Sequence, residues 1–223
     1  MSESGHILEP AGPVIACRIA SGALTGDWKI VQTVFRDAVP CVLRQAWRDE
    51  PEPQFRPCTV RCARTHEALW ILAELDDNDI FNPVTQFNEP AFTKGDAFEI
   101  FLRPPRQDAY YEFHVSPENQ RFQLRFPGQG RVTEAAKVSD FQIDSRTQVL
   151  PDRRRWEVLA GLPFSRVAEA GLPRDGDRWL FSFSRYDYTR GEAAPVLSST
   201  SPHTICNFHR MEEWGTLLFV TVK

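Results

Sequence analysis

The sequence predicts an all-β protein, an antiparallel β-sandwich with one short helix. Apolar and polar residues alternate with a period of two over residues 97–103, 110–116 and 178–188, a pattern typical of strands that bury one face. Short segments of this kind recur along the chain and are separated by turns that contain Gly, Pro, Asn or Asp. Many strands and few helices favour two packed antiparallel sheets.

The first part of the chain carries the least distinct pattern. Residues 1–12 are expected to form a flexible tail, and residues 13–223 a single β-sandwich domain. Residues 14–47 fit either a helix or strands, and the helical interpretation rests on an apolar stripe of Val31, Val34, Phe35 and Ala38.

The hairpin predicted from residues 97–103 and 110–116 carries the most informative polar face. One of its faces is uniformly apolar and would join the core. The other face presents Glu99, Glu112 and His114. A polar face on a rigid sheet suits the binding of a polar ligand, because strands hold side chains in fixed directions.

The remaining elements follow from the same kind of pattern. Further strands are predicted over residues 59–64, 69–75, 120–126, 131–143, 147–150, 156–160 and 216–222. Residues 162–172 are the one predicted helix, because Ser165 can cap its start and Gly171 can end it. In the strand at 178–188 one face is aromatic, and the opposite face carries Ser182, Ser184 and Tyr186.

Composition argues against two classes of partner. The net charge of the 223 residues is −4 at pH 7, whereas nucleic-acid binding needs a basic surface. No apolar run is long enough to span a bilayer, so no membrane partner is expected. No signal peptide is visible and the five cysteines are an odd number. The protein is therefore predicted to be cytoplasmic, or secreted or periplasmic if a leader was removed.

Several segments resemble a known family in sequence and in order. The segment GDAFEIFLRP resembles the D-x-x-E-[IF]-F signature of the family 9 carbohydrate-binding module-like domains, part of the wider DOMON-like β-sandwich group. The other blocks of the resemblance are TVRCARTHEALWILAELDDNDI, WEVLAGLPFS, RWLFSFSRYDY and NFHRMEEWGTLLF. Together they span residues 55–222. The resemblance implies a β-sandwich, and a saccharide as partner.

Site residues follow from this resemblance position by position. Similar modules hold a sugar between two aromatic rings with polar groups around the rim, which here implies Phe92 and Phe208 as the stacking residues. Relatives that bind sugar usually have Trp at both positions. The polar contacts implied by the resemblance are Glu99, His114, Ser184 and Tyr186. The expected function is non-catalytic recognition of a mono- or oligosaccharide, so the protein is not expected to be an enzyme.

No cofactor is required by the sequence, but a structural calcium ion fits it. Similar modules bind calcium, and Asp76, Asp77 and Asp79 supply clustered carboxylate ligands of the type that calcium prefers.

Three alternatives to saccharide binding remain. A module that has lost its ligand could mediate protein contacts. A haem-binding DOMON-like domain could use His209 or Met211 as axial ligand. A glycoside hydrolase would need two carboxylates, and Glu99 and Glu112 would lie too close for an inverting mechanism.

Overall fold

Most of the chain lies in strands. The computed structural model describes residues 11–22 and 24–221, so most of the predicted tail (residues 1–10) lies outside the described residues. The strands are β1 (Val14–Ile19), β2 (Cys41–Val42), β3 (Cys58–Arg64), β4 (Ala68–Asp76), β5 (Ala97–Arg103), β6 (Tyr110–Val115), β7 (Arg121–Phe126), β8 (Ala136–Lys137), β9 (Asp144–Leu150), β10 (Arg155–Pro163), β11 (Arg178–Asp187), β12 (Val196–Ser199) and β13 (Gly215–Val220).

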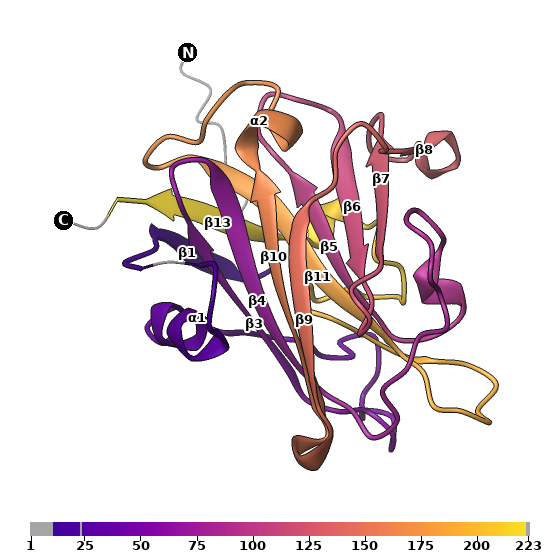
Figure 1. The fold of residues 1–223 in the computed structure, drawn as a ribbon. Helices are drawn as coiled ribbons and strands as arrows, with labels where there is room; N and C mark the ends of the chain where they lie inside the picture. Colours follow the sequence, from indigo (N-terminus) through magenta and orange to yellow (C-terminus); the bar gives the residue numbers. More distant parts are fainter. Residues whose placement is uncertain (1–10, 23, 222–223) are drawn as a thin grey trace.

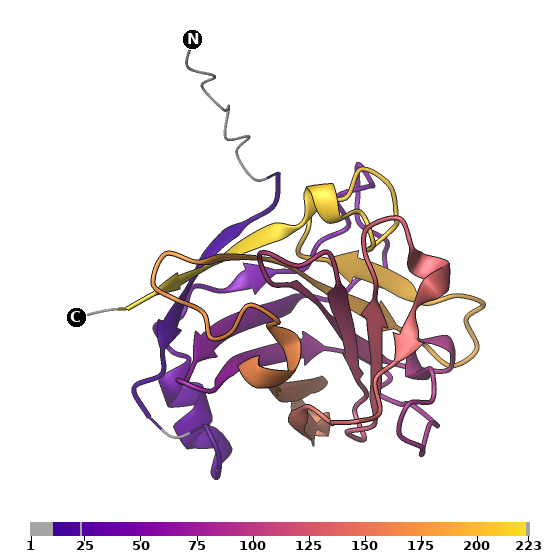
Figure 2. The same ribbon diagram turned by 90° about the horizontal axis from the view of Figure 1, so that it is seen from above.

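The strands form one curled sheet whose two halves face each other. The order along the sheet is β8-β7-β6-β5-β11-β13-β1-β3-β4-β10-β9, with β12 paired to β11 and β2 paired to β3. Figures 1 and 2 show β5, β6 and β7 in one layer and β3, β4, β9 and β10 in the other. The predicted all-β sandwich is confirmed. Its pairing is antiparallel except at β1, which runs parallel to both β13 and β3.

The main core fills the space between the two halves of the sheet. Its residues are those that the predicted alternation places on the inward face of each strand. Every residue of the apolar hairpin face is buried there, as are Trp179, Phe181 and Phe183 of β11. The opposite half contributes the inward residues of β4 and β10. The central members are Phe98, Ile100, Leu102, Phe113, Val115, Trp179, Phe181, Phe183, Ile71, Ala73, Trp156 and Val158. A one-residue shift in register would expose this whole set, so burial fixes the register.

Two helices accompany the sheet. Helix α1 (Trp28–Val34) begins at Asp27, whose side chain accepts a hydrogen bond of 2.7 Å from the Lys29 amide. Val31 and the following Phe35 pack on Leu72 and other residues of the outer face of β4 and β10. Residues 14–47 thus contain both predicted kinds of element, a helix over residues 28–34 and strands over residues 14–19 and 41–42. None of the helices in the described ranges is long and apolar enough to cross a membrane.

The helix predicted over residues 162–172 is much shorter. Helix α2 (Phe164–Val167) is a single turn, and Ser165 lies inside it and does not cap it. Residues up to Pro163 remain in β10, where they pair with β4. Pairing with a neighbouring strand outweighs local helix propensity here. Gly171 does not end the helix as predicted, because it lies four residues beyond Val167; its φ of +91° is one that glycine adopts readily.

A tight contact at the start of β13 gives a stability prediction. A Cβ atom on Gly215 would lie 2.6 Å from the Pro13 carbonyl oxygen and 2.7 Å from the Phe181 ring. Gly215→Ala is expected to lower the free energy of unfolding by about 2–3 kcal/mol, because backbone and a packed core ring must both move. Urea unfolding measures the change. Gly128→Ala is the control, since its Cβ would meet nothing closer than 3.7 Å, and equal losses in both variants would contradict the prediction.

Candidate functional site

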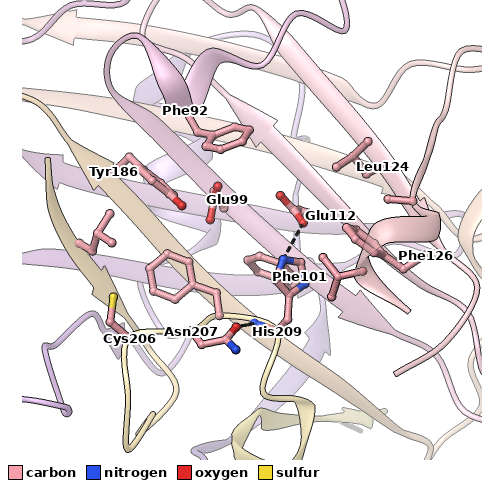
Figure 3. A pocket seen from close by; sticks show the side chains of 14 residues that line it. Phe92, Glu99, Phe101, Glu112, Leu124, Phe126, Tyr186, Cys206, Asn207 and His209 are labelled. Atoms are coloured by element: carbon pink, nitrogen blue, oxygen red, sulfur yellow. Dashed lines mark hydrogen bonds and ion pairs between the residues drawn. The ribbon is translucent and has the colours of Figure 1, made fainter. Parts of the chain in front are cut away.

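A pocket lies on the outer face of β5, β6, β7 and β11, opposite the main core. Its volume is about 350 Å³. The segment that precedes β5, the segment between β7 and β8, strand β12 and the segment that follows β12 complete its walls. The lining residues are Phe92, Glu99, Phe101, Glu112, Leu124, Phe126, Val132, Ala135, Tyr186, Leu197, Cys206, Asn207, Phe208 and His209. Figure 3 shows aromatic side chains around two carboxylates, those of Glu99 and Glu112.

Glu99, Glu112 and His114 form a buried Glu–His cluster at the base of this pocket. Strand pairing sets Glu99 directly opposite His114. Glu112 lies two residues before His114 on β6, so its side chain is on the same face. His114 Nε2 is hydrogen-bonded to Glu112, and His114 Nδ1 lies 3.3 Å from Glu99 Oε1. The sequence prediction that these three residues share one face is confirmed.

Burial and mutual charge set the protonation of this cluster. Burial raises the pKa of Glu99 to about 8, an effect that His114 opposes and Glu112 reinforces. Burial disfavours the charged imidazole of His114, but Glu99 and Glu112 together raise its pKa above the usual value. At neutral pH the cluster therefore holds both hydrogen-bond donors and acceptors, which suits hydroxyl groups.

Aromatic rings form the walls next to the cluster. The Phe92 ring centroid lies 5.2 Å from that of His114 and 5.4 Å from that of Tyr186. Tyr186 in turn lies 6.0 Å from Phe208. Phe208 is 6 % exposed and packs at 6.1 Å from Trp47. Phe92, Tyr186 and Phe208 thus line a single pocket, and their contact with a ligand stays a prediction.

Hydrogen bonds hold the two wall segments in place. The Tyr188 hydroxyl donates to the Phe92 carbonyl at 2.9 Å, and Trp214 Nε1 donates to the Phe208 carbonyl at 2.8 Å. The Asp96 carboxylate accepts from the amides of Phe81 and Tyr188, at 2.7 and 2.8 Å. Asp96 therefore joins the loop before β5 to the end of β11, and it has a structural role in positioning Phe92.

Two predicted polar residues lie behind the pocket surface. Ser184 is fully buried and donates to Ser199 Oγ at 3.2 Å, within a network that includes Ser182 and Ser201. Neither Ser184 nor His114 is among the lining residues. The alternation of β11 places Ser184 correctly beside Glu99, but β12 covers it, and no local pattern reveals that neighbour.

Other lining residues were not predicted as site residues from the sequence. Phe101 lies on the same face as Glu99, two residues further along β5, so the strand period contained the signal for it. Glu112 was placed on this face but was not assigned to the site. Phe126 and His209 come from elements whose positions depend on tertiary packing. The Tyr110 hydroxyl holds His209 through a 3.0 Å contact with Nδ1.

The aspartates predicted to bind calcium lie outside the pocket lining and face three different arginines. Asp76 Oδ1 accepts from Arg155 at 2.7 Å, and Asp77 Oδ2 accepts from Arg185 at 2.7 Å. Asp79 pairs with Arg190. In this arrangement the three carboxylates do not converge on one position, so they do not fit a shared cation. Calcium binding here stays a prediction, which a calcium titration monitored by melting temperature checks.

A second buried charged group, the Arg185 cluster, consists of Asp77, Asp96, Arg185 and Asp187. One ligand atom from each of its three carboxylates lies within 4.8 Å of the others. Burial raises the pKa of Asp96 to about 8, with the neighbouring Asp77 adding to the effect. Burial likewise raises the pKa of Asp187 to about 6.

These shifts predict that stability falls as pH rises. A carboxyl whose pKa is raised by folding stabilises the folded state fully when the pH is below its pKa in the unfolded chain, about 4. That stabilisation is lost as the pH rises through its pKa in the folded protein. For Asp187 the loss is about 2–3 kcal/mol between pH 4 and pH 7. Urea unfolding across this range measures it. Asp187→Asn should make the profile less steep, because only Asp96 then contributes, whereas the exposed control Asp140→Asn should not change it; identical profiles in all three proteins would contradict the assignment.

Comparison with known proteins supports the fold. No protein-family model and no curated protein sequence matches the chain. A candidate carbohydrate-binding protein from Bacteroides uniformis has a structure similar over 93 % of this chain and 99 % of its own, with a TM-score of 0.77 and 15 % identity. The chain has the fold of a family 9 carbohydrate-binding module. Such a module from Caldicellulosiruptor kristjanssonii aligns with 94 % of this chain in each of two complexes.

The two complexes of that module contain different sugars. The cellotriose complex has a TM-score of 0.67, 16 % identity and 95 % of its own chain aligned. The glucose complex has a TM-score of 0.66, 15 % identity and 97 % of its own chain aligned. At this identity the family 9 likeness establishes the architecture. The function of this chain depends on its own pocket.

Proposed function

We propose that the chain is a non-catalytic saccharide-binding domain whose ligand occupies the pocket above the Glu–His cluster. The proposal extends to this chain the ligand class seen in the family 9 modules with the same fold. Glu99 and Tyr186 would exchange hydrogen bonds with sugar hydroxyls, and Phe92 and Phe208 would contact the ring. His114 and Ser184 would support Glu99 from behind the pocket surface.

The observation that carries the proposal is the combination of aromatic walls with carboxylates at the base of one cavity. A pyranose has an apolar C–H face that packs on aromatic rings, and hydroxyls that need directed hydrogen bonds. Glu99 Oε2 and Glu112 Oε2 are buried and have no partner within the described part of the chain. Such unsatisfied atoms are costly, and ligand hydroxyls would relieve the cost.

A thermal-shift screen against neutral mono- and oligosaccharides tests the proposal, because a ligand that binds only the folded state raises the melting temperature. We expect a shift with at least one neutral sugar class, and loss of that shift in Phe208→Ala. Ile205→Ala, which removes an exposed side chain near this segment that does not line the pocket, should retain it. Absence of any shift at millimolar sugar would contradict saccharide binding and favour a module that mediates protein contacts.

A further inference from the structure

The Glu–His cluster contains buried polar atoms that the contacts within the cluster leave without a hydrogen-bond partner. Glu99 is 2 % exposed and His114 is 0 % exposed. Glu99 Oε2, Glu112 Oε2 and His114 Nδ1 all lack a hydrogen-bond partner among the described residues. Leaving one such buried atom unsatisfied costs about 1–3 kcal/mol, and more when the group is charged. Three unsatisfied buried atoms in one cluster indicate that a bound partner is missing.

The donor types of the cluster favour a cation as this partner, because carboxylate oxygens and imidazole nitrogens are common metal ligands. In the described part of the chain, the ion-pair partners of Glu99 and Glu112 are imidazoles, those of His114 and His209. His114 contacts both carboxyl groups, whereas His209 reaches Glu112 alone, at 3.8 Å. A buried carboxylate without a compensating charge is strongly destabilising.

The geometry brings three ligand atoms together, and a fourth, His209 Nε2, lies beside one of the three residues. Glu99, Glu112 and His114 each offer an atom within 4.8 Å of the other two. His209 Nε2 lies 3.8 Å from Glu112 Oε2, as the dashed line in Figure 3 shows. Tyr110 contacts the other ring nitrogen, Nδ1, at 3.0 Å. Contacts of this kind, on the second nitrogen of an imidazole, orient histidines that bind metals.

We infer that Glu99, Glu112 and His114 bind a divalent transition metal such as Zn²⁺ at the base of the pocket, with His209 as an additional ligand. Two imidazoles and two carboxylates are a donor set that suits zinc. Calcium takes oxygen ligands, so the imidazoles disfavour it here. Small side-chain rotations would replace the contact between His114 and Glu112 by bonds to the ion. The inference concerns residues of this chain and does not depend on saccharide binding.

Titration of the metal-free 223-residue protein with Zn²⁺ tests this site, and Co²⁺ provides a spectroscopic probe that needs no substitution. We expect a single tight equivalent of Zn²⁺, and visible absorption bands when Co²⁺ enters a low-symmetry nitrogen and oxygen site. His114→Asn and Glu112→Gln should each weaken Zn²⁺ binding at least about 100-fold, because partners outside the coordination shell are already worth about 10–100-fold.

Two control variants separate this site from incidental binding. His203→Asn alters another fully buried histidine that pairs with a glutamate, Glu213 at 3.0 Å, and should keep the wild-type Zn²⁺ affinity. Cys206→Ser removes the exposed thiol at the pocket and should also keep it. Unchanged affinity in His114→Asn, or loss of binding in Cys206→Ser alone, would overturn the inference.

The wild-type protein also decides the question if a variant does not fold. Absence of Co²⁺ bands and of a Zn²⁺-dependent rise in melting temperature would overturn the inference and show that the residues of the cluster pair only with one another. Repeating the saccharide screen in the presence of a chelator separates the two proposals. A sugar response without metal would leave saccharide binding intact whatever the outcome for Zn²⁺.

Discussion

Arg185→Leu is expected to lower the free energy of unfolding by about 3–5 kcal/mol, because it leaves buried carboxylates without their cation. Arg185 is 1 % exposed. It donates to the Asp76 carbonyl at 2.6 Å and to Asp77 Oδ2 at 2.7 Å, and it lies 3.2 Å from Asp187 Oδ1. Leucine would fill part of the space, but it would satisfy none of these acceptors.

Guanidinium unfolding of Arg185→Leu beside Arg190→Leu measures the effect. Arg190 also pairs with an aspartate, Asp79, but its side chain is 62 % exposed. An exposed pair contributes about 0–1 kcal/mol, so the control should change stability little. Similar losses of stability in both variants would mean that the buried ion pairs of Arg185 contribute no more than the exposed pair of Arg190.

Glu99→Ala is expected to abolish saccharide binding without unfolding the protein. A sugar that makes two hydrogen bonds to this carboxyl would lose about 3 kcal/mol, which is about 100-fold in affinity. Removing one buried carboxyl also relieves the crowding with Glu112, so the variant should stay folded. Isothermal titration with the sugar found in the screen measures the change.

Glu157→Ala is the matched control for this second prediction. Glu157 is as buried as Glu99, at 1 % exposure, but it lies on β10 and accepts hydrogen bonds from Gln32 and Gln148. Its replacement should leave sugar affinity unchanged. Unchanged affinity in Glu99→Ala would refute the assignment of Glu99 to the ligand site.

The strand period predicted the parts of the fold and site that depend on local alternation. Phe98, Ile100 and Leu102 entered the core, and Glu99 faced His114, because paired strands carry a period of two across the sheet. The helix over 162–172 was overextended because its first residues pair with β4, a contact distant in sequence.

The rest of the site depends on loops, which have no such period. Phe208 lies in the segment between β12 and β13, and Trp214 sets its place through a side chain to backbone contact. Ser184 was placed on the correct face, yet its coverage by Ser199 depends on the position of β12. Convergence of Asp77, Asp96 and Asp187 on Arg185 joins three separate segments and could not be predicted from the spacing of the acidic residues.

The position of β13 has a consequence for folding during synthesis. It pairs with β11 on one side and β1 on the other, so it is the strand that joins the two halves of the sheet. It follows the other strands of this sheet in the chain, so it leaves the ribosome after all of them. Until then the edges of β1 and β11 would be unpaired, and open edges of this kind are templates for aggregation. Chaperone dependence during translation should therefore end only when residues 215–220 become available to close the sheet.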